Sequence, residues 1–130
     1  MCIFCKIING EIPCYKVYED DKFLAFLDIS QATIGHTLVV PKKHYPNILS
    51  LEDNDILGVV SLVCKKIEKA LDVHNFNILN NCGVKAGQTV DHFHIHIIPR
   101  YDNDTMKIEF GSNELTKEAF SELCDKIKKN

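Results

Sequence analysis

Three histidines alternate with apolar residues in the run His92-Phe93-His94-Ile95-His96. Because successive side chains of a β-strand point to opposite faces, the three imidazoles are predicted to project from one face, about 6–7 Å apart. Every buried imidazole must find hydrogen-bond partners, so packing alone explains three of them on one face poorly. The spacing therefore predicts a site that does chemistry.

Two kinds of chemistry could use this row of imidazoles. Imidazoles two residues apart on a strand can hold a catalytic zinc ion. Alternatively, one imidazole attacks phosphorus while its neighbours orient it and assist the leaving group. The preceding loop favours phosphorus chemistry, because amide, hydroxyl and backbone N–H donors suit phosphate oxygens. These loop residues are Asn81, Gly83, Gly87, Gln88 and Thr89.

The strands that must position this row follow from the apolar pattern and from the turns between apolar runs. They are expected at residues 14–18, 23–27, 36–41, 76–79 and 91–98. The first two form a hairpin around an acidic turn. The early hairpin and the helices between the later strands predict an α+β fold, in which an antiparallel five-stranded meander carries helices on one face.

Three helices are expected around these strands. The first covers residues 2–9, the second runs from a cap at Ser50 and Asp53 to Leu71, and the third begins at Thr116. The long second helix keeps one face apolar at helical spacing. On the third, the residues expected to face the core are Phe120, Leu123, Cys124 and Ile127.

The composition is that of one folded domain covering residues 1–130. The chain is 45% hydrophobic and 25% charged, which excludes disorder, collagen and a coiled-coil rod. Fifteen basic against 18 acidic residues give a net charge of −3. With Arg100 as the single arginine, we expect neither nucleic acid nor a membrane surface as a partner.

Six cysteines are many for a chain of this length. The first residues lack the basic and then apolar pattern of a signal peptide, and no apolar run approaches the ~18 residues of a membrane span. A disulfide framework is therefore not expected. The cysteines predict a cytoplasmic protein with reduced thiols, some of which bind metal.

The histidine run resembles the motif of the histidine-triad (HIT) superfamily, and three other segments match its Hint branch and bacterial relatives. These segments are Ile3–Pro13, Phe23–Ser30 and Gly35–His44. The resemblance covers residues 2–101, while residues 102–130 carry no family motif. It implies a HIT-like fold with a long helix and a C-terminal helix, and a homodimer.

The function implied by the resemblance is hydrolysis of purine nucleotides. The substrates would be nucleoside 5′-phosphoramidates or compounds with related P–N or P–O–P nucleotidyl bonds, and AMP or GMP would be bound. The reaction would pass through a covalent nucleotidyl-histidine intermediate.

Residue roles carry over by position. His94 would be the nucleophile, His96 would contact the α-phosphate and assist the leaving group, and His36 would belong to the same network. Asp28 would accept hydrogen bonds from the ribose hydroxyls. The base would lie against Ile3, Phe4, Ile7, Phe26 and Ile29. The phosphate would be bound by Asn81, Gly87, Gln88, Thr89 and the backbone of Val90.

Cys2-x-x-Cys5 is a weak metal signal alone, because two ligands do not complete a tetrahedral zinc site. Similar bacterial proteins complete the site with two histidines, at the positions of His44 and His92. The resemblance therefore implies a structural zinc ion that ties the N-terminal segment to the sheet. The chemistry itself would need no cofactor.

Two rival functions stay open. In the first, His92, His94 and His96 hold a catalytic zinc ion in a zinc-dependent hydrolase. In the second, the chain is a nucleotide-binding regulatory module whose hydrolysis is incidental.

Overall fold

The computed structural model describes residues 1–130 and contains one five-stranded sheet. Its strands are β1 (Lys16–Glu19), β2 (Phe23–Leu27), β3 (Thr37–Pro41), β4 (Phe76–Leu79) and β5 (Ile95–Pro99). The spatial order is β1-β2-β3-β5-β4, and every neighbouring pair is antiparallel. The expected α+β class with an antiparallel five-stranded sheet is confirmed. The strands follow chain order from β1 to β3, and β5 lies between β3 and β4.

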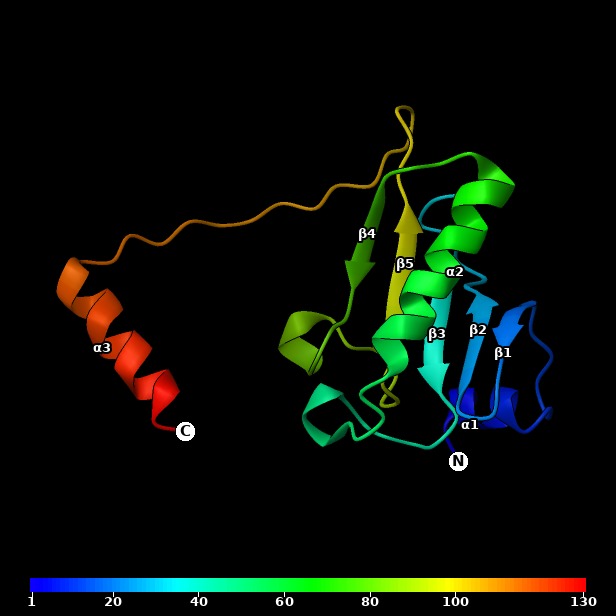
Figure 1. Cartoon of the computed structure of the whole chain (residues 1–130), viewed down its shortest axis with the longest axis horizontal. Coiled ribbons are helices and arrows are strands. Elements are labelled where there is room, and N and C mark those ends of the chain that lie inside the picture. Colours follow the sequence, from blue (N-terminus) through cyan, green and yellow to red (C-terminus); the bar gives the residue numbers. More distant parts are fainter.

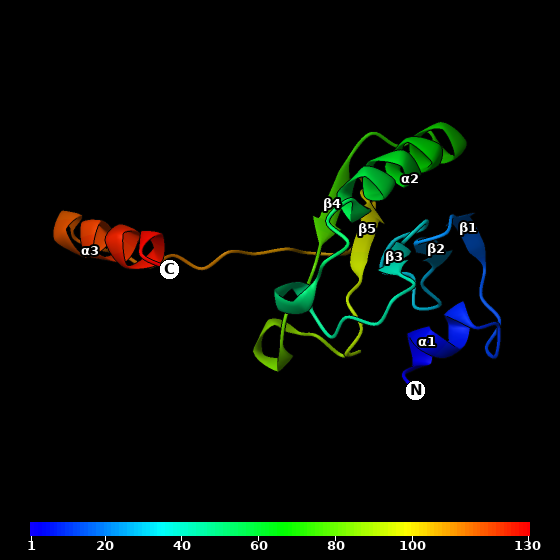
Figure 2. The ribbon, with the colours of Figure 1, turned by 60° about the horizontal axis from the view of Figure 1, so that its bottom comes forward.

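Two helices pack on opposite faces of this sheet (Figures 1 and 2). The long helix α2 (Ile56–Leu71) covers one face, whose core includes Val39 and Ile97. The short helix α1 (Ile3–Ile8) covers the other, where Phe4 and Ile7 pack on alternate residues of β2 and β3. The expectation of helices on one face only is therefore wrong, because both faces of β2 and β3 are apolar.

The start of α2 differs from the sequence-based prediction. Ser50 belongs to a separate 3₁₀ turn (Ile48–Ser50), where it pairs with the capping residue Asn47. The helix begins six residues later, after Asp55. Its expected apolar face is confirmed, since the buried side chains are Ile56, Val60, Val63 and Ile67.

The last strand is shorter at its start than the predicted 91–98. The backbone of residues 92–94 does not join the sheet ladder. Instead, the Phe93 N–H donates to the Tyr45 carbonyl at 2.6 Å, and the His94 carbonyl accepts from the side chain of Asn80 at 2.9 Å. His96 is thus the one histidine of the row on β5 itself.

Beyond the sheet, the chain runs as an extended segment to α3 (Lys117–Lys128), which lies away from the body (Figure 1). No residue of α3 is buried, and Phe120 and Ile127 are 57% and 69% exposed. The prediction that this helix faces the core is wrong for a single chain. Helical periodicity identifies an apolar face but not the surface that covers it.

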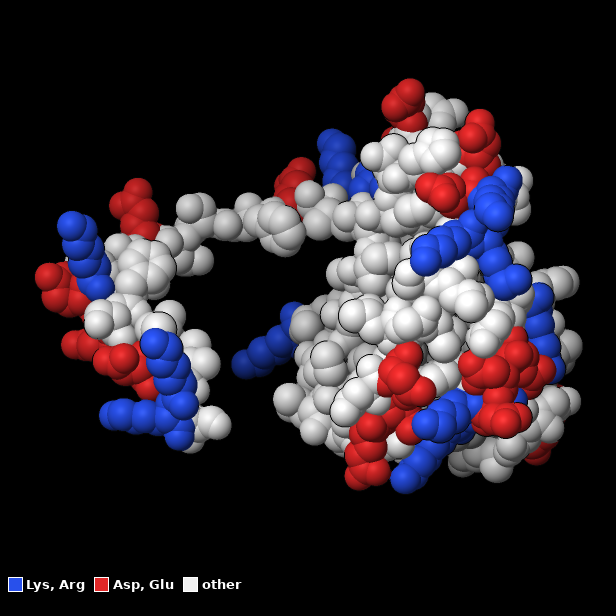
Figure 3. All heavy atoms as spheres, in the orientation of Figure 1, with Lys and Arg blue, Asp and Glu red and all other residues white.

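Figure 3 shows acidic and basic side chains interspersed on both the body and α3. No helix has the length and apolar character required to cross a bilayer. A cytoplasmic location stays a prediction.

Candidate functional site

Three histidines that lie on or just before the neighbouring strands β3 and β5 meet on one face of the sheet. His36 directly precedes β3, and His96 lies on β5 opposite Leu38. His36 Nε2 is 2.9 Å from His96 Nδ1, and the ring centroids of His94 and His96 are 5.0 Å apart. The antiparallel pairing of β3 with β5 therefore joins residues that are 60 positions apart in the sequence.

The hydrogen bond of His94 leaves one ring nitrogen free. His94 Nδ1 lies 2.7 Å from the carbonyl oxygen of His92, and a carbonyl can only accept, so Nδ1 carries the proton. Nε2 then holds a lone pair, and no protein group bonds to it. Burial lowers the pKa of His94 and so favours the neutral ring. This is the form that a nucleophilic imidazole requires.

His96 is held in the opposite tautomer. The backbone N–H of Ala32 donates to His36 Nδ1 at 3.2 Å, so the neutral His36 ring carries its proton on Nε2. That proton points to His96 Nδ1, which leaves the His96 proton on Nε2. Burial and the neighbouring rings of His94 and His36 lower the pKa of His96 to about 4. The site therefore presents one imidazole lone pair beside one imidazole N–H.

Asp28 adds the one carboxylate of this cluster. Its Oδ2 lies 3.6 Å from His36 Nε2, and its Oδ1 accepts from the backbone N–H of Ser30 at 2.8 Å. The same residue lines the pocket beside the histidines. It is therefore placed where a carboxylate could accept hydrogen bonds from a bound ligand.

An apolar pocket opens between α1 and the C-terminal end of β2. All five residues predicted for the base wall line it: Ile3, Phe4, Ile7, Phe26 and Ile29. The Phe4 ring lies 5.0 Å from the ring of His94, so the pocket adjoins the histidines. Six further lining residues were not predicted: Ile12, Pro13, Cys14, Tyr15, Leu27 and Leu38. Four of these belong to the turn before β1, and no motif in the sequence marks that turn as a wall.

The loop before the histidine row is held by Gln88. This buried carboxamide accepts from the Gly83 N–H at 2.8 Å and donates to the carbonyls of Pro46 and Val90. Its polar atoms therefore stabilise the loop, which differs from the predicted contact of its side chain with phosphate. Gly87 and Thr89 are exposed on the same loop.

Two asparagines of this region also bond to the backbone, one of them predicted and one not. The Asn81 side chain makes a long 3.5 Å contact with the Gly87 carbonyl. The missed residue is Asn80, whose side-chain N–H donates to the carbonyl of the candidate nucleophile His94. In the sequence Asn80 has only the composition of a turn, so nothing distinguishes it from its neighbour.

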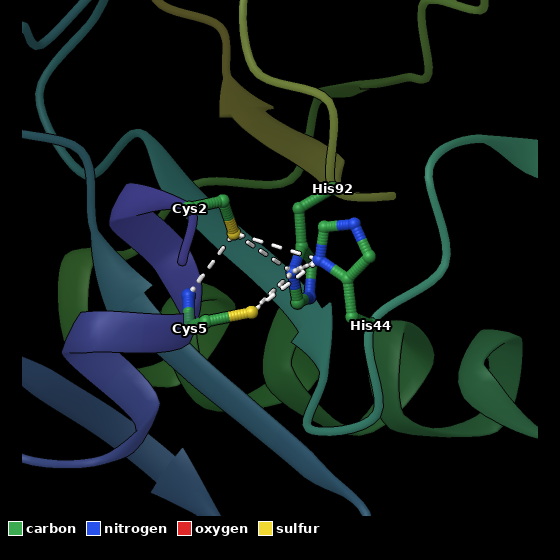
Figure 4. Close-up of side chains that lie close together, drawn as sticks. All are labelled: Cys2, Cys5, His44 and His92. Atoms are coloured by element: carbon green, nitrogen blue, oxygen red, sulfur yellow. Dashed lines mark hydrogen bonds between the residues drawn. The ribbon is translucent and has the colours of Figure 1, made fainter.

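A second cluster lies near the N-terminal end of α1 (Figure 4), where four side chains converge: Cys2, Cys5, His44 and His92. Sulfur–nitrogen distances run from 3.3 to 3.6 Å, and the two Nδ1 atoms are 3.1 Å apart. Zinc with ordinary tetrahedral bond lengths would separate sulfur and nitrogen by about 3.6 Å and two nitrogens by about 3.3 Å. The four residues therefore fit a closed tetrahedral zinc site.

The surroundings of these four residues suit metal binding too. His92 Nε2 donates to the carbonyl of Pro41 at 2.8 Å, which leaves its Nδ1 lone pair for a metal. The backbone N–H of Cys5 donates to Cys2 Sγ at 3.2 Å, a contact that stabilises a thiolate.

Comparison with known proteins gives the family. The HIT domain matches residues 9–103. An uncharacterized HIT-like protein of Methanocaldococcus jannaschii is 49% identical over 98% of this chain and 99% of its own. The adenosine 5′-monophosphoramidase of Schizosaccharomyces pombe is 43% identical over 98% of both chains.

A solved structure agrees with these sequence matches. The crystal structure of a HIT family protein from Bacillus anthracis superposes with a TM-score of 0.92 and 49% identity, covering 98% of this chain and 95% of that one. The match thus includes the sheet, the histidine row and most of the C-terminal segment. The chain belongs to the HIT family.

Proposed function

We propose that this protein hydrolyses nucleoside 5′-phosphoramidates or related nucleotidyl bonds through a covalent intermediate on His94. The observation that carries the proposal is the pair of complementary imidazoles, with the free His94 Nε2 lone pair beside the His96 Nε2–H. The apolar pocket next to them has room for a purine base. The phosphoramidase activity named for the fission yeast relative supports the same reaction class.

The reaction would take place in two displacements at phosphorus. His94 Nε2 attacks, the P–N bond breaks, and the departing amine leaves with the electron pair and a proton delivered through His96. Water then attacks the phosphorus, the P–Nε2 bond breaks with its electron pair returning to His94, and one water proton passes to His96 as the nucleoside monophosphate is released. Atoms and charges balance over the two steps, and no metal takes part.

Substrate positioning falls to the neighbouring elements. The purine of AMP or GMP would enter between α1 and β2, and the ribose hydroxyls would donate to Asp28. The phosphate would contact Asn81, Gly87, Thr89 and the backbone of Val90. Gln88 would act through the shape of this loop.

Labelling tests the covalent step. Wild-type protein quenched in alkaline denaturant during turnover of an adenosine phosphoramidate labelled at phosphorus should carry label that a later acid treatment releases. His94→Ala should take up none and still bind AMP. His74→Ala is the matched control, because that imidazole is exposed and contacts Glu68 outside the site.

Two outcomes would contradict the proposal. Normal turnover by His94→Ala would exclude the intermediate. Tight AMP binding by the wild type without turnover of any phosphoramidate would instead favour a regulatory binding module.

We also propose that the tetrad Cys2, Cys5, His44 and His92 holds a structural zinc ion. Four protein ligands leave no open position, so the ion would stabilise the fold without reacting. The geometry disfavours the rival catalytic zinc, because His92 Nδ1 faces the thiols while His94 Nδ1 bonds a carbonyl. Zinc retained with activity after both cysteines are replaced would support the rival.

A homodimer is the assembly we propose for the single domain of residues 1–130. The apolar face of α3 lies away from its own body, and an isolated helix of this length is marginal in water. The superposition on the Bacillus anthracis structure covers 98% of the chain, so it includes α3. A second copy would cover the exposed face.

A further inference from the structure

The loop from Asp28 to His36, which joins β2 to β3, supplies two groups of the histidine cluster. The Asp28 N–H donates to the His36 carbonyl at 3.0 Å, and the side chain of Gln31 adds further hydrogen bonds across the loop. The carboxamide Nε2 of Gln31 donates to the carbonyls of both Asp28 and His36, the second at 2.8 Å. Its Oε1 accepts from the Gly35 N–H, also at 2.8 Å. Gln31 therefore ties the first residue of the loop to the last.

The residue after Gln31 contacts His36 directly. Ala32 follows Gln31 directly, and its backbone N–H is the group that donates to His36 Nδ1 at 3.2 Å. A backbone N–H can only donate, so this contact decides which nitrogen of His36 is protonated. Moving the Ala32 amide would remove the preference.

His36 passes this choice on to His96. With Nδ1 occupied as an acceptor, His36 donates from Nε2 to His96 Nδ1 at 2.9 Å. His96 must then carry its own proton on Nε2, the nitrogen without a protein partner. The hydrogen-bond chain therefore links the Gln31 loop to the free N–H of the site.

We propose that Gln31 is a positioning residue, whose carboxamide holds the Ala32 amide on His36 and so keeps His96 in its Nε2–H tautomer. The effect on turnover rests on the proposed function. The effect on the tautomer does not, because it is a property of the free protein.

A purely structural role for Gln31 would predict that replacing its side chain unfolds the protein, and the packing of the chain argues against this. The side chain belongs to an exposed residue and to neither core cluster, so its removal leaves the apolar packing intact. The loop also keeps other anchors, such as the Thr33 hydroxyl on the Pro99 carbonyl at 2.6 Å. A variant should therefore fold, with the change confined to the hydrogen-bond chain.

The direct test is the ring nitrogen spectrum of His96 in the ¹⁵N-labelled, ligand-free full chain. In the wild type we expect Nδ1 without a proton and Nε2 with one. In Gln31→Met, which keeps the length and loses the polar atoms, we expect a mixture of both tautomers. Gln31→Glu should act in the same direction, because it sets a carboxylate against two carbonyl oxygens. Ser30→Ala is the control in the same loop, and its spectrum should match the wild type.

Kinetics supply the second readout. With an adenosine phosphoramidate, kcat of Gln31→Met should fall by about tenfold, the usual effect of losing a group that orients a functional histidine. KM should stay within about twofold, since the pocket is unchanged. An unchanged His96 spectrum in both Gln31 variants would overturn the proposal, whatever the rate. Failure of the wild type to turn over any phosphoramidate would instead contradict the proposed function and leave the spectral test valid.

Discussion

At the scale of residues, the backbone determines the chemistry of the site more than charged side chains do. A carbonyl fixes the proton of His94 on Nδ1, and an amide fixes that of His36 on Nε2. The single arginine, Arg100, is bound to Asp104 and Asn77 outside the cluster. A phosphate at this site would therefore meet neutral donors rather than a guanidinium.

The low pKa of His96 predicts a specific pH dependence of stability. The unfolded chain protonates this residue near 6.5, whereas the folded protein keeps it neutral down to about 4. Its contribution is therefore complete above pH 6.5 and is lost as the pH falls toward 4. Denaturant titrations at pH 7.5 and 5 should show a smaller loss of unfolding free energy for His96→Asn than for the wild type.

His92 and His94 also titrate, but they are present in both proteins, so the difference between the two slopes isolates His96. Parallel pH profiles for the wild type and the variant would contradict the assignment.

Gly35 is a second residue with a specific requirement. Its φ is +97°, and an added Cβ would lie 2.8 Å from Leu71 Cδ1 and 3.1 Å from Pro99 Cγ. Gly35→Ala should lower the free energy of unfolding by about 1–3 kcal/mol. Gly58→Ala is the matched control on α2, where a Cβ meets nothing within 4 Å, and it should raise stability by about 0.5–1 kcal/mol. Urea titration measures both, and equal effects would be inconsistent with strain at Gly35.

At the scale of elements, α1 connects the tetrad of Cys2, Cys5, His44 and His92 to the pocket. This helix has six residues, too few for a stable isolated helix. Cys2 and Cys5 belong to the tetrad, while Phe4 between them contacts the rings of both His92 and His94. Loosening the tetrad should therefore displace a wall of the pocket.

Removal of the metal should weaken nucleotide binding. Chelation or Cys5→Ser is expected to raise the AMP dissociation constant by about tenfold, within the usual range of coupling between sites. Calorimetry measures the affinity, and hydrogen exchange should show lower protection of α1. Cys124→Ser is the control, since that exposed thiol lies on α3. An unchanged AMP affinity in metal-free protein would show that α1 is held without the tetrad.

The elements differ in how far the sequence predicts them. The apolar face of α2 is a local pattern, and Val60 and Val63 lie where helical spacing places them. The alternation of His92, His94 and His96 is likewise a local pattern, and it predicts where the candidate site lies. The start of α2 is not predictable in this way, because Ser50 has the side chain of a helix cap but pairs with Asn47 in a 3₁₀ turn, and the helix starts after Asp55 without a side-chain cap.

Residues that act through the backbone escape prediction for a related reason. Gln31 and Asn80 bond to main-chain groups that only the folded loop brings within reach. Their side-chain chemistry alone gives no sign of this. The four residues predicted as zinc ligands follow from the family pattern, and the structure brings them together.

At the scale of the whole molecule, the arm formed by residues 107–116 and α3 is the unusual feature. Residues 107–115 make no hydrogen bond to the body, and α3 buries no side chain. An amphipathic helix in this position exposes Phe120, Leu123 and Ile127 to solvent unless another chain covers them.

Deletion of residues 107–130 should therefore yield a folded monomer, whereas the full chain should sediment as a dimer. The body should stay folded, since the arm contributes nothing to its core. Phe120→Ser with Leu123→Ser in the full chain should have the same effect on mass. A truncated chain that still sediments as a dimer would assign the contact to the body instead.

The apolar lining of the pocket has a consequence for selectivity. An apolar pocket contacts every flat ring in the same way, so an amino or keto group on the ring changes the affinity of the ligand little. The protein should therefore bind nucleotides with many different bases, including synthetic ones, with similar affinity. It should show little selectivity for any one nucleotide of the cell. Discrimination among natural compounds then has to come from the group on the far side of phosphorus. A library that varies this group should spread the rates widely, while one that varies the base should not.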